Sequence, residues 1–260
     1  MTKNVLITGA ASGLGLELAK AYAARGDRVI SLDKNIETSL SRNIPQIEFK
    51  EIDIADHERS AAFISSLKDN RELPDIVIFN AAIHAIDNDP FIDFDTLQNT
   101  MDTNMMSVFN FLARIMPELA KPCTFVFCGS GVVIFPNPAY LGYYLSKLAV
   151  TSAFDLFSSR YTEHGMRFKS VILGPLASPM LERSKQPAGL TKILRDFTTG
   201  RVEILVPKII RFADGPGKRL YYRKASAVVL WTARIIQSIL PMRFKVYKAR
   251  KLPGGEKPRP

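Results

Sequence analysis

A chain of 260 residues, 47% hydrophobic and 23% charged, can form one sizeable core and is short for two. Its two cysteines, Cys123 and Cys128, exclude a disulfide framework. Its three histidines, His57, His84 and His164, are scattered and exclude a cluster of metal ligands, so we expect structural or surface roles for them. With no signal-peptide pattern at the start, a reducing cytoplasmic setting is the default.

The net charge of +10 belongs to the C-terminal quarter of the chain. Residues 201–260 carry 15 basic residues against 3 acidic ones, whereas residues 1–200 carry 20 against 22. A basic segment can bind nucleic acid, an anionic membrane surface or an acidic substrate, or it can remain solvated. Nothing in the segment resembles a nucleic-acid recognition module, so nucleic acid is not a favoured partner.

Short β-rich runs alternate with helical patterns through the first 130 residues. Strands are predicted at residues 4–9, 28–33, 47–53, 75–82 and 123–130. Helices are predicted at residues 13–26, 61–69 and 94–119. Strands separated by helices form parallel sheets that are covered on both faces. We therefore expect an α/β fold with one doubly wound parallel sheet.

The C-terminal quarter is less regular. Residues 226–240 read as an apolar helix that Pro241 ends, and they are fewer than the ~20 residues that a membrane span needs. Residues 244–248 alternate as in a last strand. Residues 251–260 are expected to form a flexible basic tail, so that a single domain spans residues 1–250.

The stretch TGAASGLG, from Thr8 to Gly15, follows a predicted strand and opens a predicted helix. Glycines allow close backbone approach, and a helix N-terminus attracts phosphate. The spacing is G-x-x-x-G-x-G, and the alternative is an ordinary tight turn, but the context favours a dinucleotide. Asp33 closes the next strand, where a carboxylate accepts hydrogen bonds from ribose hydroxyls and repels a 2′-phosphate. We favour NAD(H) over NADP(H), although Lys34 softens that repulsion and Asp33 can also merely cap a turn.

The stretch YLGYYLSK, residues 140–147, offers three tyrosines near one lysine. Tyr143 lies four residues before Lys147 and shares its face of a helix, whereas Tyr144 is rotated to one side and Tyr140 lies two turns away. A phenol titrates near pH ~10, and a nearby ammonium lowers that value. Tyr143 and Lys147 are therefore a sensible acid–base pair, although a tyrosine beside a lysine is more often surface decoration. Ser130, at the end of a predicted strand, suits a substrate oxygen.

These motifs, in this order, resemble the short-chain dehydrogenase/reductase family over residues 3–180. The cofactor turn, the DIAD stretch at residues 53–56, FNAA at 79–82 and LGPLAS at 173–178 resemble its cofactor elements, with Ala82, Leu173 and Ser178 as departures. The resemblance implies a Rossmann-type sheet. It also implies cofactor contacts from Gly9, Ser12, Gly13, Leu14, Gly15, Asp33, Asp53, Ile54, Asn80, Ala81, Tyr143, Lys147, Gly174 and Ser178.

The same resemblance places Asn104, Ser130, Tyr143 and Lys147 at the family's catalytic positions. Tyr143 is then the acid–base residue, Ser130 binds the substrate oxygen, and Lys147 lowers the pKa of Tyr143 and holds the nicotinamide ribose. Asn104 anchors a proton relay by holding a water or the backbone near Lys147. Tyr140 and Tyr144 pack or line the mouth of the pocket. The reaction implied is interconversion of an alcohol and a ketone or aldehyde.

In the family a lid follows position 178, here residues 179–224. Its apolar residues include Met180, Leu181, Ile193, Leu194, Phe197, Ile204 and Leu205. They either line a hydrophobic, lipid-like substrate pocket or pack the lid onto the core. By analogy we expect a homodimer or homotetramer, often formed through helices at 94–119 and 143–160.

Two other readings remain open. The chain can be a dinucleotide-binding protein without turnover, which the four intact catalytic positions disfavour. It can also be a peripheral protein of the cytoplasmic membrane face that uses residues 226–251, an apolar helix with a basic flank. Sugar epimerases and dehydratases share Tyr-x-x-x-Lys, but their glycine turn is usually spaced differently.

Overall fold

The computed structural model describes residues 2–36, 44–85, 92–134, 140–174, 176 and 200–221. Seven strands form one parallel sheet in the order β3-β2-β1-β4-β5-β6-β7. The strands are β1 (Asn4–Thr8), β2 (Arg28–Asp33), β3 (Ile47–Glu51), β4 (Ile76–Phe79), β5 (Cys123–Ser130), β6 (Met166–Leu173) and β7 (Arg219–Tyr221). The doubly wound parallel sheet expected from the sequence is confirmed.

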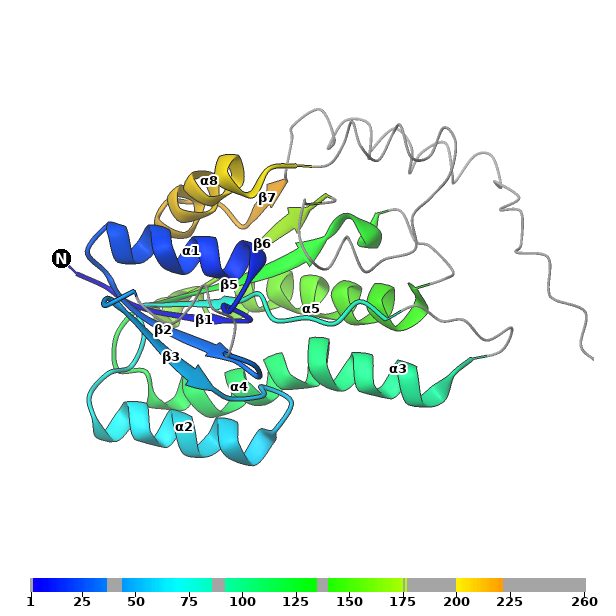
Figure 1. Ribbon diagram of the computed structural model, residues 1–260, viewed down its shortest axis with the longest axis horizontal. Helices are drawn as coiled ribbons and strands as arrows, with labels where there is room; N and C mark the ends of the chain where they lie inside the picture. The colour runs from blue at the N-terminus through cyan, green and yellow to red at the C-terminus, as the bar shows by residue number, and fades with distance from the viewer. Residues whose placement is uncertain are drawn as a thin grey trace, which may run out of the picture.

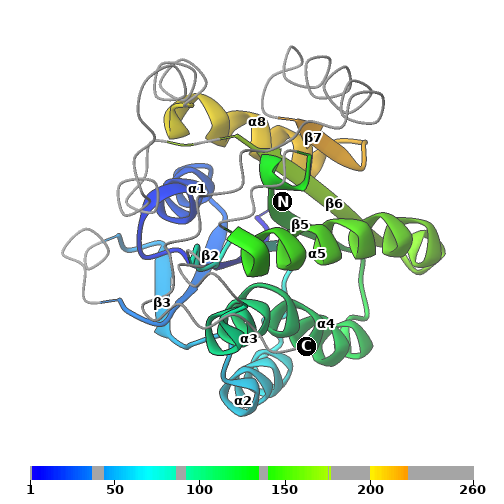
Figure 2. The same cartoon turned by 90° about the vertical axis from the view of Figure 1, so that its right-hand side faces the viewer.

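Helices cover both faces of the sheet, as Figures 1 and 2 show. The α-helices are α1 (Gly13–Ala24), α2 (His57–Asp69), α3 (Phe94–Met101), α4 (Ser107–Ile115), α5 (Leu141–Arg160) and α8 (Val202–Asp214). Short helical turns are η1 (Asp102–Met106), η2 (Met116–Glu118), η3 (Gly131–Val133) and η5 (Thr162–His164). Helices α1 and α8 lie on one face, and α2, α3, α4 and α5 lie on the other.

Because side chains alternate along each strand, they contribute to two separate cores, one on each face of the sheet. On β1, Val5 and Ile7 join the cluster under α1 and α8, whereas Leu6 joins the cluster under α2, α4 and α5. Successive strand side chains point to opposite faces, so a strand buried on both faces must be apolar throughout. This accounts for the three consecutive apolar residues Val5, Leu6 and Ile7 in β1.

The predicted helix at 94–119 is real but is not one regular helix. It begins where Asp93 caps the backbone N–H of Thr96, and it passes through the π-helical turn η1 between α3 and α4. In η1 the N–H of Ser107 reaches back five residues to the carbonyl of Asp102. Such turns occur often at functional sites, and Asn104 lies within this one.

Helix α8 and strand β7 occupy part of the range that the sequence assigns to a lid. Leu205 and Ile209 are fully buried in the core shared with α1, and β7 pairs in parallel with β6. Of the two uses that the sequence leaves open for these apolar residues, packing onto the core is the one found for Leu205, whereas Ile204 is 53% exposed. Residues 179–199, the helix predicted at 226–240, the strand predicted at 244–248 and the tail lie outside the described residues.

Within the described ranges, no helix is long and apolar enough to cross a membrane. Those same residues contain no group of three or more metal-ligating side chains. Cys123 and Cys128 are both buried free thiols. Burial raises the pKa of both thiols, that of Cys128 to about 12, so the free cysteines belong to the core.

Candidate active site

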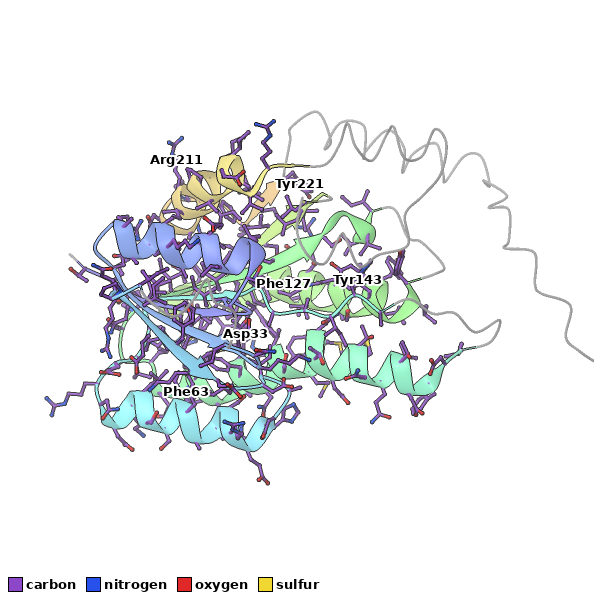
Figure 3. All side chains as sticks on the ribbon, viewed as in Figure 1. Asp33, Phe63, Phe127, Tyr143, Arg211 and Tyr221 are labelled. Carbon is purple, nitrogen blue, oxygen red and sulfur yellow. The ribbon has the colours of Figure 1, made fainter. Side chains whose placement is uncertain are left out.

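The candidate site residues gather where the parallel strands end. Thr8, Asp33 and Ser130 are the last residues of β1, β2 and β5, so they share one edge of the sheet. Figure 3 labels Asp33 and, at the start of α5 on the same side, Tyr143. The strand order changes direction between β1 and β4, and ligands of open α/β sheets bind in the crevice at that point.

The glycine turn after β1 is packed against the loop after β4. Gly9 has a left-handed φ of +67°, and a Cβ on it would lie 2.6 Å from the Cα of Ala81. A Cβ on Gly15 would lie 2.2 Å from the carbonyl oxygen of Gly9. Neither position accepts a side chain, so the turn requires glycine for its own packing as well as for any close ligand.

Helix α1 begins with features that suit an anion. Its N-cap, Ser12, is exposed and its side chain makes no capping hydrogen bond, and the first turn holds no acidic residue. Gly13 starts the helix with a φ of +54°. The side chain of Leu14 is buried in the core, so of this residue only the backbone in the first turn is left to meet a phosphate.

Asp33 braces the glycine turn. One carboxylate oxygen accepts a hydrogen bond from the N–H of Ala11 at 3.0 Å, and the other accepts one from the N–H of Asn35 at 3.2 Å. The side chain is partly exposed, and each carboxylate oxygen accepts more than one hydrogen bond. Turn capping and ribose binding, which the sequence leaves as alternatives, are therefore compatible.

Asp53 and Ile54 follow β3 at the same edge. A carboxylate oxygen of Asp53 accepts a hydrogen bond from the N–H of Ala55 at 2.9 Å, which shapes the local turn. Ile54 is buried in the core under α2. Its side chain therefore serves packing, and Asp53 keeps the more accessible polar group.

Asn80 and Ala81 tie the loop after β4 to β1. The side-chain amide of Asn80 donates to the carbonyl of Gly9 at 2.8 Å. The backbone N–H groups of both residues donate to the hydroxyl of Thr8, each at 3.1 Å. Thr8 is absent from the residues predicted for the site, although a hydroxyl residue at the last position of a buried strand was a usable signal.

Tyr143 is the tyrosine that meets Ser130. A hydrogen bond joins the two side chains. Tyr140, the N-cap of α5, lies one turn before Tyr143 on the same side of the helix start, whereas Tyr144 follows Tyr143 and is rotated away from it. Burial raises the pKa of Tyr143 above its ordinary value, and the hydrogen bond with Ser130 works in the opposite direction. The expectation that Lys147 lowers this pKa is corrected for the chain alone: burial of the phenol dominates.

Lys147 is buried beside Tyr143. Its Nζ donates to the carbonyl of Cys128 at 3.0 Å and lies 5.7 Å from the centre of the Tyr143 ring. It also lies 4.7 Å from the centre of the Phe127 ring. Burial lowers the pKa of Lys147 to about 8. An ammonium has three donors, so two remain after the carbonyl bond.

Asn104 acts on a different stretch of backbone from the one expected. Its side chain accepts from the N–H of Ile83 at 2.8 Å and donates to the carbonyl of Ile83 at 2.9 Å. It also donates to the hydroxyl of Ser146 at 3.2 Å, which in turn donates to the carbonyl of Tyr143 at 2.9 Å. Asn104 thus reaches the neighbour of Lys147, but it mainly clamps the loop after β4.

His84 comes next to that clamp. Its ring stacks on Tyr140 with centroids 4.3 Å apart and meets Tyr143 edge-to-face at 4.6 Å. The structural role expected for His84 is therefore exerted within the candidate site, by packing on two of its tyrosines. Gly174 follows β6 at the same edge, and Ser178 lies outside the described residues.

Comparison with known proteins decides the family. The family model described as short chain dehydrogenase matches residues 3–189. The chain belongs to the short-chain dehydrogenase/reductase family. A curated relative, "Uncharacterized oxidoreductase DltE" of Bacillus subtilis, is 31% identical over 209 residues, which cover 74% of this chain and 79% of the relative. The chain is thus an oxidoreductase of a dinucleotide-binding family.

Solved structures agree on the fold. A short chain dehydrogenase from Burkholderia cenocepacia in complex with NADP has a TM-score of 0.75 at 22% identity, covering 92% of this chain and 95% of that one. The 3-ketoacyl-(acyl-carrier-protein) reductase from Brucella melitensis complexed with NADH has a TM-score of 0.73 at 18% identity, covering 85% and 96%. At these identities the likeness concerns the fold alone, and the two structures hold different dinucleotides.

Proposed function

We propose that this dehydrogenase interconverts an alcohol and a ketone or aldehyde with NAD(H), using Tyr143 as acid and base. The observation that carries the proposal is the hydrogen-bonded pair of Ser130 and Tyr143 at the carboxyl edge of the sheet, with the ammonium of Lys147 behind it. A phenol and a hydroxyl that share one position can both bind the oxygen of a carbonyl group.

The glycine turn fits a dinucleotide. Gly9 and Gly15 keep the turn free of side chains, and the N-terminus of α1 offers backbone donors without a competing carboxylate. The ribose is assigned to Asp33 and the adenine to Asp53; each carboxylate is partly exposed and already accepts a backbone N–H that fixes its position. Lys147 keeps donors for the nicotinamide ribose. The resemblance adds Gly174 and Ser178 beside the nicotinamide.

In carbonyl reduction, Tyr143 donates its proton to the developing alkoxide while Ser130 hydrogen-bonds the same oxygen. The bound nicotinamide supplies the hydride. In alcohol oxidation Tyr143 removes the proton instead. Asn104 holds the loop at Ile83 and, through Ser146, the first turn of α5, so that the acid and its surroundings stay in register.

Replacement of Tyr143 by Phe tests the assignment. We expect turnover to fall by ~10²–10⁴-fold, the usual worth of general acid–base catalysis, while the Kd for NADH changes little. Tyr144→Phe is the matched control, because it removes a phenol from the same turn. Loss of NADH binding in Tyr143→Phe, or equal losses of turnover in both variants, contradicts the proposal. NADH binding by the wild type without turnover on a broad panel of carbonyl compounds favours a protein that binds without catalysis.

Preference for NAD(H) rests on Asp33. Its carboxylate is held toward the turn and disfavours a 2′-phosphate, while Lys34 next to it is exposed. Fluorescence titration with NADH and NADPH in parallel measures the preference. We expect tighter NADH binding in the wild type and a shift toward NADPH in Asp33→Ser. Tighter NADPH binding in the wild type contradicts the preference and leaves the reaction class intact.

For the substrate we propose a hydrophobic alcohol or ketone, on the apolar residues Met180, Leu181, Ile193, Leu194 and Phe197 of the segment 179–199. Paired assays with 2-decanone and 2-butanone test it, and a KM lower for the longer ketone is the expected result.

For assembly we propose a homodimer or homotetramer. The exposed Leu156 on α5, at 71%, supports this, and sedimentation of the wild type and Leu156→Glu measures it.

A second function, contact with an anionic membrane surface, is favoured by the basic C-terminal quarter. We propose residues 226–251 as the contact. The outer face of α8 adds support, because Lys208 and Arg211 are exposed on it together with Ile204. Sedimentation with anionic and neutral liposomes, with and without residues 241–260, tests the proposal, and cell fractionation tests the cytoplasmic setting. If the same fraction of protein sediments with anionic and with neutral liposomes, for both the full chain and the chain without residues 241–260, membrane contact is rejected.

A further inference from the structure

His84 stands between two tyrosines that lie one turn apart at the start of α5. It stacks on Tyr140 with an interplanar angle of 22° and meets Tyr143 at 81°. Offset stacking and edge-to-face contact are the two arrangements that aromatic rings prefer. The imidazole therefore packs on both phenol rings: it stacks face to face on Tyr140 and meets Tyr143 in a perpendicular contact.

The backbone that carries His84 is fixed from the other side. Asn104 binds both the N–H and the carbonyl of Ile83, the residue just before His84. Asn104 also donates to Ser146, whose hydroxyl donates to the carbonyl of Tyr143. A chain of hydrogen bonds thus links the backbone beside His84 to the backbone of Tyr143. The contact between the rings of His84 and Tyr143 is a second link between the same two residues.

We propose that His84 is a positioning residue for Tyr143: its ring holds the phenol against Ser130 and shields it from water. The inference rests on the proposed function of Tyr143. Ser130 binds the hydroxyl of Tyr143, the Lys147 ammonium lies 5.7 Å from the centre of its ring, and His84 contacts the ring itself. Because Tyr140 braces the far side of the imidazole, the ring of His84 has little room to turn.

The protonation state of His84 is consistent with this role. Burial lowers the pKa of His84, and the positive charge of Lys147 lowers it further, so the ring is neutral at pH 7. The titratable groups near it are Tyr140, the N-cap of α5, together with Tyr143 and Lys147 on α5. A neutral ring packs on two phenols without competing with Lys147 for a ligand.

The first test needs no substrate. Tyrosine labelled with ¹³C at Cζ reports the ionisation of each phenol, and Tyr143→Phe assigns the signal of Tyr143. Since burial is the largest cause of the raised pKa of Tyr143, His84→Ala admits water and shifts the titration midpoint down by on the order of one pH unit. His84→Phe keeps the ring contacts and leaves the midpoint close to that of the wild type. Circular dichroism at each pH confirms folding, and His164→Ala, an exposed histidine, is the control.

An unchanged midpoint in His84→Ala, or an equal shift in His84→Phe, overturns the positioning role. If His84→Ala fails to fold, Tyr140→Leu removes the brace from the other side and is expected to give a smaller shift in the same direction. No shift in that variant overturns the proposal as well.

The second test uses NADH and the carbonyl compound that the substrate screen finds fastest. We expect His84→Ala to lose about tenfold or more in kcat with NADH affinity and thermal midpoint retained, and His84→Phe to recover most of the loss. A change in KM alone overturns the positioning role in favour of a substrate contact. Failure of the proposed function looks different, because Tyr143→Phe would then retain turnover.

Discussion

At the amino ends of the strands the charged groups are paired with one another, whereas at the carboxyl ends the buried cation faces uncharged groups. Asp214 accepts from Lys3 at 2.6 Å and from Arg25, and Arg25 also pairs with Asp27 at 2.6 Å. Lys147 at the other end has a carbonyl and two aromatic rings as partners. Paired charges fasten α1 to the end of α8, while an unpaired ammonium keeps its charge for a ligand.

Two buried lysines make the comparison sharper. Lys169 and Lys147 are each 2% exposed, and burial lowers the pKa of both to about 8. Lys169 donates to two carbonyls at the end of α8, those of Phe212 at 2.8 Å and Gly215 at 2.5 Å. Lys147 donates to one. The same side chain is a helix cap in one place and a candidate for chemistry in the other, and a perturbed pKa alone does not separate them.

The largest effect is expected from Lys147→Met. Turnover should fall by ~10²-fold or more because the acid–base pair loses its cation, while the thermal midpoint falls less than in Lys169→Met, because only one carbonyl, that of Cys128, loses its donor. Steady-state kinetics and calorimetry measure the two quantities. Lys20→Met, which removes a half-exposed partner of Glu17, is the control. A large drop in thermal midpoint with turnover per folded molecule preserved would make Lys147 a structural residue like Lys169.

Lys169→Met should show the reverse pattern. Two carbonyls at the end of α8 lose their donor, and unsatisfied buried groups cost about 1–3 kcal/mol each. We expect an earlier midpoint of urea unfolding with kcat unchanged at low denaturant. Lys68→Met, at an exposed pair with Glu118, is the control. Unchanged unfolding would mean that water replaces the ammonium and that α8 is held by its apolar face alone.

Asp214→Asn tests the paired end and should have the smallest effect. Burial acts to raise the pKa of Asp214, but hydrogen bonds from Lys3 and Arg25 outweigh it and lower the pKa. A carboxylate with a lowered folded-state pKa stabilises the fold above its unfolded value, about 3.9, and loses that contribution as the pH falls through the folded value. For partly exposed pairs we expect about 1 kcal/mol at pH 7. Urea unfolding at pH 7 and pH 3 measures it, and a difference that persists at pH 3 contradicts the ion-pair explanation.

Local spacing was enough to predict which candidate site residues lie together within one turn of chain. The four-residue step from Tyr143 to Lys147 and the glycines after β1 follow from helix and turn geometry, and the structure brings both sets to one edge. What spacing omits is contact between distant segments. His84 meets Tyr143 across 59 positions of sequence only because β4 and α5 end and begin at the same edge.

Burial is the other quantity that the sequence left unweighed. The expected lowering of the Tyr143 pKa considered the ammonium of Lys147 but not the loss of water around the phenol. The range 202–214 was assigned to the lid through the family resemblance, and the sequence left open whether its apolar residues line a pocket or pack onto the core. Helix α8 packs against α1, which ends almost 180 residues earlier, and no local pattern within 202–214 predicts that contact.

The π-helical turn at Asp102–Met106 amounts to a single extra residue inserted into a long helix. Deleting one residue there would restore the ordinary i to i+4 bonding and make a straighter helix. The wider turn takes up the ~100° that one extra residue would add in a regular α-helix, so the apolar faces of α3 and α4 keep their phase on either side of it. Deletion would therefore remove the bulge that carries Asn104, and with it the clamp on Ile83, while the two flanking helices stay in register. One helical segment thus combines a continuous core face with a local bulge that is free to serve the site.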